Sequence, residues 1–102
     1  MDFQGFIESK MRNAWIQEPG LKLYVRVSLP SRGTDYDLAT MLATPRGKGA
    51  LTRFLDAWEP TFSFYIENVL HPERLGKYFL SRGYREVLNY NGVKCCCYSN
   101  GK

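Results

Sequence analysis

A glycine-rich turn with two cations is the stretch of this sequence whose residue types best fit a binding site. It runs Thr44-Pro45-Arg46-Gly47-Lys48-Gly49, between an apolar run that ends at Ala43 and an amphipathic run that begins at Ala50. When a strand turns through glycines into a helix, the first backbone N–H groups of that helix have no partner inside it. These amides and the helix dipole favour an anionic group, most often phosphate. The alternative is an ordinary strand–helix turn with solvated charges.

Glu67 and Asn68 form a second set of candidates, because they lie near the C-terminal end of a predicted strand. Ligands bind at that end of the strands in open α/β sheets. Glu67 can act as a general base there, and Asn68 can orient an acceptor group or a water molecule. The alternative is that both residues begin a loop and cap the helix that starts near Pro72.

Other polar residues have the right type for proton transfer but fit structural roles at least as well. Asp35 and Asp37 are spaced to share one face of a strand, where polar edge positions are common. Arg26 is expected to pair with one of these aspartates at the surface. His71 precedes a proline and is typical of a helix-cap or turn residue.

The spacing of apolar residues predicts the elements that position these candidates. Residues 21–29 alternate between apolar and polar, as a half-buried strand does, whereas residues 38–43 are nearly all apolar, as in a strand covered on both faces. The expected elements are a helix at about 2–18 ending at Pro19-Gly20, strands at 21–29 and 35–43 joined by a turn at 30–34, a helix at 50–58, a strand at 61–70, a helix from Pro72 to Gly83, and a hairpin of strands 84–88 and 93–98.

This order predicts one α/β domain: a mixed, twisted sheet of about five or six strands with helices on both faces. We expect the strands at 35–43 and 61–70 to be parallel and joined by a right-handed crossover. With 102 residues, 44% of them hydrophobic, the chain is long enough for a packed core. A short N-terminal region can leave a sheet edge that a second copy covers, so a homodimer is one option.

Charge and composition narrow the function classes. The net charge is +4 and the pI is near 9.1, which permits an anionic ligand, an acidic protein or a nucleic acid as partner without requiring any of them. No apolar run reaches the roughly 18 residues of a membrane span, and the N-terminus lacks a signal-peptide pattern. We therefore expect a cytoplasmic protein with no membrane partner.

Three consecutive cysteines, Cys95 to Cys97, are expected to be free thiols that fill space on a terminal strand. Neighbouring strand residues point to opposite faces, so these cysteines are poorly placed to bridge one another or to hold one metal ion. With His71 as the sole histidine, no metal site is expected.

The order and type of the elements from about residue 21 to residue 98 resemble the GNAT superfamily of N-acetyltransferases. The resemblance is carried by Ala43-Thr44-Pro45, the turn Arg46-Gly47-Lys48-Gly49, the helix end Arg82-Gly83-Tyr84 and the closing hairpin. The chain looks most like the short GNAT-like proteins of bacteriophages, which carry a similar Arg-Gly-Lys-Gly turn and a similar Glu67-Asn68-Val69-Leu70 segment. The resemblance implies a single, truncated GNAT-like domain over residues 1–102, with its core at about 21–98.

In this family the glycine turn carries the pyrophosphate of acetyl-CoA, the co-substrate. The family signature is Gln or Arg, two residues, Gly, one residue, then Gly or Ala. It maps onto Arg46, Gly49 and position 51, which is Leu51 here. The end of the strand before the turn would supply a backbone N–H to the oxyanion. The residues implied in cofactor binding are Met41, Ala43, Arg46, Gly47, Lys48, Gly49, Ala50, Leu51 and Thr52.

The family often places a tyrosine general acid on its last helix, four residues before the terminal glycine. Counting back from Gly83 gives Phe79, which cannot transfer a proton. Tyr78 is adjacent and about a third of a turn away, so it joins Glu67 and Asn68 as the third catalytic candidate.

Three functions follow as hypotheses. The first is acetyl transfer from acetyl-CoA to an amine of a protein or small molecule. The second is a catalytically inactive GNAT-like phage protein that binds and modulates a host protein, as an inhibitor, an anti-defence factor or a virion-associated protein. The third is a basic module associated with nucleic acid. A cluster of cations near the cleft would suit CoA phosphates as well as an acidic partner: Arg46, Lys48, Arg53, Arg74, Lys77, Arg82 and Arg85.

Overall fold

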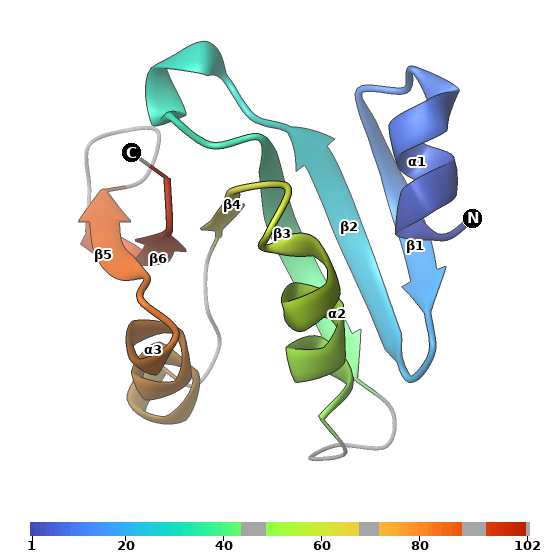
Figure 1. The fold of residues 1–102 in the computed structure, drawn as a ribbon. Coiled ribbons are helices and arrows are strands. Elements are labelled where there is room, and N and C mark those ends of the chain that lie inside the picture. Colours follow the sequence, from blue (N-terminus) through green and yellow to red (C-terminus); the bar gives the residue numbers. More distant parts are fainter. Residues whose placement is uncertain (44–48, 68–71, 89–93, 102) are drawn as a thin grey trace.

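The computed structural model describes residues 1–43, 49–67, 72–88 and 94–101, which form a six-stranded mixed sheet and three α-helices (Figure 1). The strand order is β1-β2-β3-β4-β6-β5; β3 and β4 are parallel, and every other neighbouring pair is antiparallel. The elements are α1 (Phe3–Ser9), β1 (Asn13–Glu18), β2 (Leu21–Val27), the short 3-10 helix η1 (Pro30–Arg32), β3 (Tyr36–Ala43), α2 (Ala50–Trp58), β4 (Phe64–Ile66), α3 (Pro72–Ser81), β5 (Arg85–Leu88) and β6 (Lys94–Ser99). The α/β class, the mixed sheet and the parallel pairing of β3 with β4 are confirmed.

The N-terminal prediction of one helix at about 2–18 is wrong. Helix α1 stops at Ser9, because Lys10 adopts a left-handed conformation with φ of 62°. The chain then forms β1, in which Trp15 is exposed and Ile16 is buried. Pro19-Gly20, which was expected to end a helix, instead lies between β1 and its antiparallel partner β2. The local spacing was compatible with both structures, and pairing with β2 decides between them.

Strand β3 carries a bulge, which corrects the expectation that its second half is covered on both faces. Its register with β2 pairs Val25 with Leu38 and Tyr24 with Thr40, so Ala39 is an extra residue. Thr40 is exposed, whereas Leu38 is completely buried. The apolar run at 38–43 therefore has two causes. One is burial, and the other is the extra residue Ala39, after which the alternation of side chains between the two faces is shifted by one residue.

All three α-helices lie on one face of the sheet, not on both as expected. The crossovers β3–α2–β4 and β4–α3–β5 step across the sheet in the same direction, and right-handed crossovers with the same step place both helices on the same side (Figure 1). Helix α1 packs on this side too, since Phe3 contacts Phe54 of α2 and Phe64 of β4. We call this side the helix face and the other side the far face; of the described helices, η1 alone lies by the far face.

The core beneath the helices is strongly aromatic. Phe3 is completely buried, and its ring contacts six other aromatic rings with centroid separations of 4.9 to 6.3 Å. Its partners are Phe6, Tyr36, Phe54, Trp58, Phe62 and Phe64. Most of these contacts are edge-to-face, the arrangement that aromatic quadrupoles favour. The N-terminal helix is thus tied to the middle of the chain.

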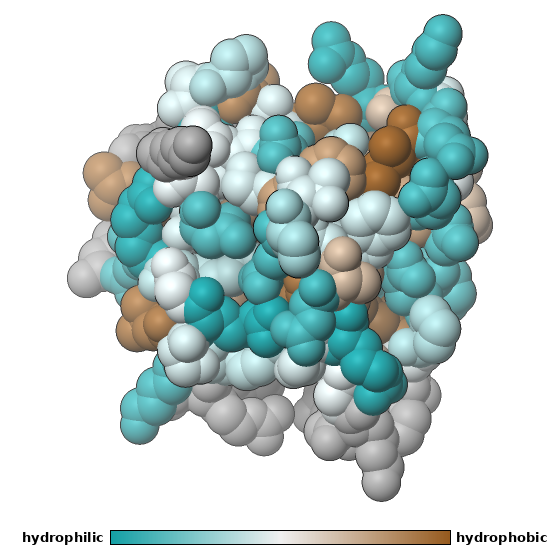
Figure 2. Space-filling model, in the orientation of Figure 1, coloured by the Kyte–Doolittle hydropathy of each residue, from teal (hydrophilic) through white to brown (hydrophobic). Residues whose placement is uncertain are grey.

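The helices of the second half follow the sequence closely, whereas the strands are shorter than expected. Helix α2 has the predicted bounds, and Gly83 has the left-handed φ of 90° expected after α3. Strand β4 begins only at Phe64, because the amides of Thr61 and Phe62 still bond to the Trp58 carbonyl. In Figure 2, which shows the view of Figure 1, hydrophilic colours predominate and the coloured hydrophobic residues are scattered. No described helix is long and apolar enough to cross a membrane.

Candidate functional site

Gly49, the last residue of the predicted phosphate-binding turn, directly precedes α2. It has a left-handed conformation, with φ of 73°, and provides no side-chain cap. The first-turn amides of Ala50, Leu51 and Thr52 therefore receive no hydrogen bond from a capping side chain at residue 49. Ala50 is buried and Leu51 packs partly buried against the core. Free amides at the first turn of a helix can interact with an anion.

Five of the six residues of the predicted turn, 44–48, lie outside the described residues. The predicted cofactor residues Arg46, Gly47 and Lys48 lie outside the described residues, as do the predicted catalytic residue Asn68 and the alternative base His71. Of the predicted strand end, Met41 packs against the core and Ala43 pairs in register with Leu21. The structure therefore positions the strand and helix on either side of the turn.

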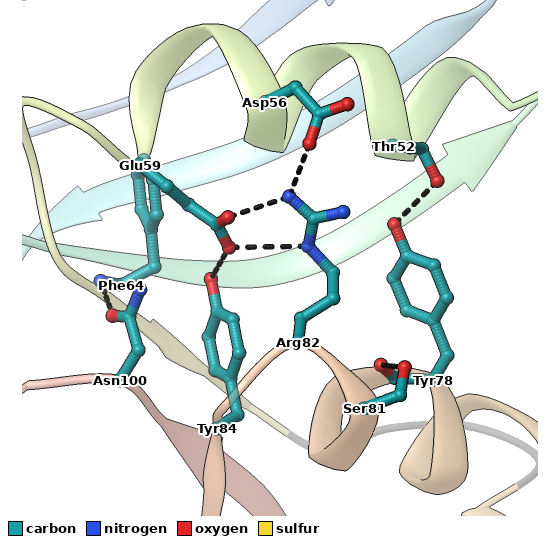
Figure 3. Close-up of polar contacts among 9 residues, drawn as sticks. All are labelled: Thr52, Asp56, Glu59, Phe64, Tyr78, Ser81, Arg82, Tyr84 and Asn100. Atoms are coloured by element: carbon teal, nitrogen blue, oxygen red, sulfur yellow. Dashed lines mark hydrogen bonds and ion pairs between the residues drawn. The ribbon is translucent and has the colours of Figure 1, made fainter.

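Two of the predicted site residues, Thr52 and Tyr78, are in direct contact. The hydroxyl oxygens of Thr52 in α2 and Tyr78 in α3 lie 2.6 Å apart, a hydrogen bond in which either group can donate (Figure 3). The guanidinium carbon of Arg82 lies 5.8 Å from the centre of the Tyr78 ring. A phenol on α3 is therefore held beside the first turn of α2.

Arg82 is engaged by acidic residues of α2 instead of facing a phosphate site. Its guanidinium donates to Glu59 at 2.6 Å and to Asp56 at 2.7 Å (Figure 3). Tyr84 donates its hydroxyl to the same Glu59 carboxylate at 2.8 Å. The hydrogen bond to Glu59 raises the pKa of Arg82, whereas the pKa of Tyr84 is raised mainly by burial and next by its bond to Glu59. These contacts hold α3 against α2. Because Arg82 is paired with carboxylates, it is not one of the cations available to a phosphate, contrary to the prediction.

Strands β3 and β4 are parallel neighbours, and α2 lies between them in the sequence. Their described ladder contains three residue pairs, from Tyr36–Phe64 to Leu38–Ile66, and β3 then continues to Ala43 in register with β2. The amide of Glu67 adds one further bond, to the Leu38 carbonyl at 3.1 Å. The chain therefore leaves β3 for α2 from the C-terminal end of this parallel pair.

Glu67 lies on the far face of the sheet, in a polar cluster around Arg26. The Arg26 guanidinium forms an ion pair with Glu67 and lies 3.6 Å from the carboxylate of Asp37. Asp37 is completely buried and accepts a hydrogen bond of 2.5 Å from Ser28. The prediction that Arg26 pairs with an aspartate is thus confirmed, but Asp37 is a buried partner and not a surface one.

Asp35, the other aspartate considered as a base, has a structural role. Its carboxylate accepts a hydrogen bond of 2.8 Å from the Ser63 amide and one of 3.2 Å from the Ser63 hydroxyl. These bonds fix the start of β4 beside the start of β3. Asp35 and Asp37 therefore organise the strands, and Glu67 directly follows the C-terminal end of β4.

A cavity on the far face was not predicted from the sequence, because its residues come from four distant segments. Arg32, Tyr65, Arg85 and Ser99 are among its lining residues. No local motif links a turn arginine with residues of β4, β5 and β6, and only the sheet register brings them together. Cys97 is buried and outside any disulfide, as expected for a space-filling cysteine. The described residues contain no group of three or more His, Cys, Asp or Glu side chains able to hold a metal ion.

The geometry supplies a helix start for an anion, two parallel strands connected through that helix, a phenol on the helix face and a carboxylate on the far face. Such an arrangement can bind a phosphorylated ligand and move protons on either side of a reacting group. Comparison with known proteins adds no identity to this geometry: no family model, no curated protein and no solved structure matches the chain.

Proposed function

We propose that this protein is a GNAT-like N-acetyltransferase that transfers an acetyl group from acetyl-CoA to an amine of a protein or small molecule. The observation that carries the proposal is the β3–α2–β4 unit, in which α2 connects two parallel strands and begins after a left-handed Gly49 that provides no side-chain cap. It is supported by two proton-transfer groups that belong to opposite faces of the sheet, Tyr78 on the helix face and Glu67 on the far face. The element order, which resembles the GNAT superfamily, motivates the choice of co-substrate.

The start of α2 would hold the pyrophosphate of acetyl-CoA. The uncapped amides after Gly49 and the positive end of the helix dipole provide the anion site. The resemblance adds the cations Arg46 and Lys48. Leu51 packs against the core, so its side chain is directed to the protein interior at the position where the family has a small residue.

The chemistry needs positioning and three proton transfers. Glu67, directly or through water, takes the proton that the ammonium must lose before attack. The amine nitrogen then attacks the thioester carbonyl carbon, a C–N bond forms, and a backbone N–H at the end of β3 stabilises the oxyanion of the intermediate. The C–S bond breaks with its electron pair leaving on sulfur, and Tyr78 gives a proton to the departing thiolate. The nitrogen loses its extra proton as the amide forms, and that proton returns to the Tyr78 oxygen, directly or through water.

Titration with acetyl-CoA tests the proposal at its first step. A ligand that binds only the folded protein raises its thermal stability, so acetyl-CoA is expected to raise Tm and to release or absorb heat in calorimetry. Gly49→Glu is expected to abolish this binding, since it places bulk and negative charge at the helix start.

Gly83→Glu is the matched control for that variant. Gly83 also has a positive φ, 90° against 73° for Gly49, so both substitutions strain the backbone, but Gly83 follows α3 and open space surrounds it. Acetyl-CoA binding that survives in Gly83→Glu and disappears in Gly49→Glu supports the site. No stability change at millimolar acetyl-CoA rejects the co-substrate.

A second candidate function is binding of a host protein without catalysis. It is favoured by Phe79, which is completely buried and stacked on Tyr98 at the position where the family often has its general acid. The two functions separate in one assay. A protein that binds no acetyl-CoA, releases no CoA with any amine and captures one specific partner supports the binding function; acetyl-CoA turnover excludes it.

A further inference from the structure

A cavity on the far face has the composition of an anion site. It measures about 290 Å³ and opens beneath η1, over the part of the sheet formed by β4, β6 and β5. That volume is near the lower end of the range for small-molecule pockets, roughly 300–1,000 Å³. Its lining residues are Ser31, Arg32, Tyr65, Arg85, Val87, Leu88 and Ser99.

The sheet register explains why the polar lining residues converge. Ser99 is the register partner of both Tyr65 in β4 and Arg85 in β5, so these three side chains leave the sheet on the same side. Arg32 reaches the group from η1, and its guanidinium carbon lies 3.8 Å from the centre of the Tyr65 ring. Two arginines from separate segments therefore border one small cavity.

Both arginines are held in place by neighbouring groups. The planar guanidinium of Arg32 lies over the Tyr65 ring, whose hydroxyl donates to the Leu88 carbonyl at 3.2 Å. Arg85 donates to the Gly101 carbonyl at 2.5 Å. A guanidinium carries five N–H donors, so the bond from Arg85 to one carbonyl leaves a positively charged group with further donors. Preorganised arginines bind an anion at a lower cost in side-chain entropy than mobile ones.

The charge of the cavity is positive near neutral pH. None of its described lining residues is an Asp or a Glu, and two are arginines. Burial and a hydrogen bond with Cys97 raise the pKa of Tyr65, so its phenol adds no negative charge there. Ser31 and Ser99 add hydroxyl groups, and Val87 with Leu88 adds an apolar wall.

We propose that this cavity binds a small amphipathic anion: an oxyanion headgroup, phosphate or carboxylate, carried on a compact apolar body. The two guanidinium groups and the serine hydroxyls hold the headgroup, since arginine matches the geometry of both oxyanions. The body lies against Val87 and Leu88. Its lining residues include neither Glu67 nor any residue of α2, so the proposal does not depend on the proposed acetyl transfer.

Phenyl phosphate is the first probe, measured by calorimetry at constant ionic strength. It is expected to bind at least about tenfold more tightly than inorganic phosphate, which lacks the apolar body, or benzyl alcohol, which lacks the anionic headgroup. Phenylacetate in a parallel titration shows whether the phosphate or the carboxylate headgroup is preferred. The proposal is overturned if neither aromatic anion binds better than benzyl alcohol.

Two exposed leucines give a matched pair of variants. Leu88 lines the cavity and is 55% exposed, whereas Leu80 on α3 is 53% exposed and is not a lining residue. Leu88→Glu brings a negative charge to the cavity and is expected to weaken phenyl phosphate binding about tenfold or more. Leu80→Glu adds the same charge and is expected to leave binding unchanged. Equal binding by the two variants places the ligand elsewhere and overturns the proposal.

The Gly49→Glu variant separates this site from the proposed acetyl-CoA site. It is expected to keep its affinity for phenyl phosphate even though its α2 start is blocked. Loss of phenyl phosphate binding in Gly49→Glu, with retention in Leu88→Glu, assigns the anion to the helix start and rejects the far-face site.

Discussion

The hydroxyl oxygens of Thr52 and Tyr78 lie 2.6 Å apart, so the first turn of α2 is linked directly to α3. This bond places a phenol beside the helix start that the proposed function requires. It also gives Tyr78 two separable roles, one in holding the helices together and one in proton transfer.

Substitutions at the two ends of this bond distinguish these roles. Thr52→Val and Tyr78→Phe are each expected to lower the free energy of unfolding by about 1 kcal/mol, and the double variant by little more, because both remove one hydrogen bond. Under the proposed function Tyr78→Phe also lowers kcat by about 100-fold, the typical contribution of a general acid, whereas Thr52→Val keeps the phenol and most of the activity. Denaturant unfolding and CoA-release kinetics check this; equal kcat in both variants contradicts a proton-transfer role.

Arg82 is expected to contribute strongly to the attachment of α3. Its side chain is 16% exposed, and it bonds to Glu59 and Asp56 of α2. Arg82→Met leaves the partly buried Glu59 without this cation, and we expect a loss of about 2 kcal/mol in denaturant unfolding. Lys77→Met on the same helix is the control, because Lys77 is exposed. Similar losses in the two variants would show that the cluster adds little.

Stability is expected to fall at alkaline pH partly through Tyr84. Burial and the bond to Glu59 raise the pKa of Tyr84 in the folded protein above its ordinary value of 10.0. The folded state therefore keeps this proton where the unfolded state loses it, so the contribution is complete below about pH 10 and is lost as pH rises above that value. Denaturant unfolding between pH 8 and pH 11, roughly spanning that ordinary value, is expected to show a shallower decline for Tyr84→Phe than for the parent protein. Equal slopes would exclude Tyr84 as a source.

The two ion pairs of Arg26 are expected to contribute unequally to the free energy of unfolding. Asp37 is completely buried and Glu67 is not, so Arg26→Met leaves a buried carboxylate without its cation and is expected to cost about 3 kcal/mol. Glu67→Gln leaves the Arg26–Asp37 pair intact and is expected to cost less than about 1 kcal/mol. Under the proposed function, however, Glu67→Gln lowers kcat while leaving acetyl-CoA affinity unchanged. A stable Arg26→Met protein would contradict the buried-pair argument.

Gly76 is expected to tolerate no side chain. A Cβ atom at this position would lie 2.5 Å from the Tyr98 hydroxyl oxygen, so Gly76→Ala must displace Tyr98 or α3. We expect a loss of about 1 to 3 kcal/mol despite the better helix propensity of alanine. Gly5→Ala in α1 is the control, because its nearest side-chain atom, an Asp2 oxygen, lies 3.2 Å away. A more stable Gly76→Ala protein would show that the contact relaxes freely.

Local sequence signals predicted the elements with strong helix boundaries. Helix α2 begins after Gly49 and α3 ends before Gly83, both with left-handed backbones that favour glycine. The N-terminal error has a different origin: the residues of β1 fit helical spacing, and their strand form depends on pairing with β2. A pattern within one segment contains no information about its partner.

The candidate site was likewise predictable only in part. Thr52 and Tyr78 were each predicted from the sequence as site residues, but the contact between them depends on how α3 packs against α2. The far-face cavity was missed because Arg32 and Arg85 approach each other only through η1 and the order of β4, β6 and β5. The side of the sheet on which each helix lies depends on the strand order, because this order sets the direction of each crossover. Local periodicity does not reveal the strand order, so the expectation of helices on both faces was wrong.

The aromatic contacts of Phe3 bear on how the chain folds during synthesis. Phe3 is synthesised before its partners, which extend to Trp58, Phe62 and Phe64. The apolar face of α1 must stay unburied in this core until the chain has been made as far as Phe64. Contacts between residues so distant in sequence slow folding. Ribosome-bound chains that stop before Phe64 are therefore expected to recruit chaperones through Phe3 and Phe6, and longer chains to release them.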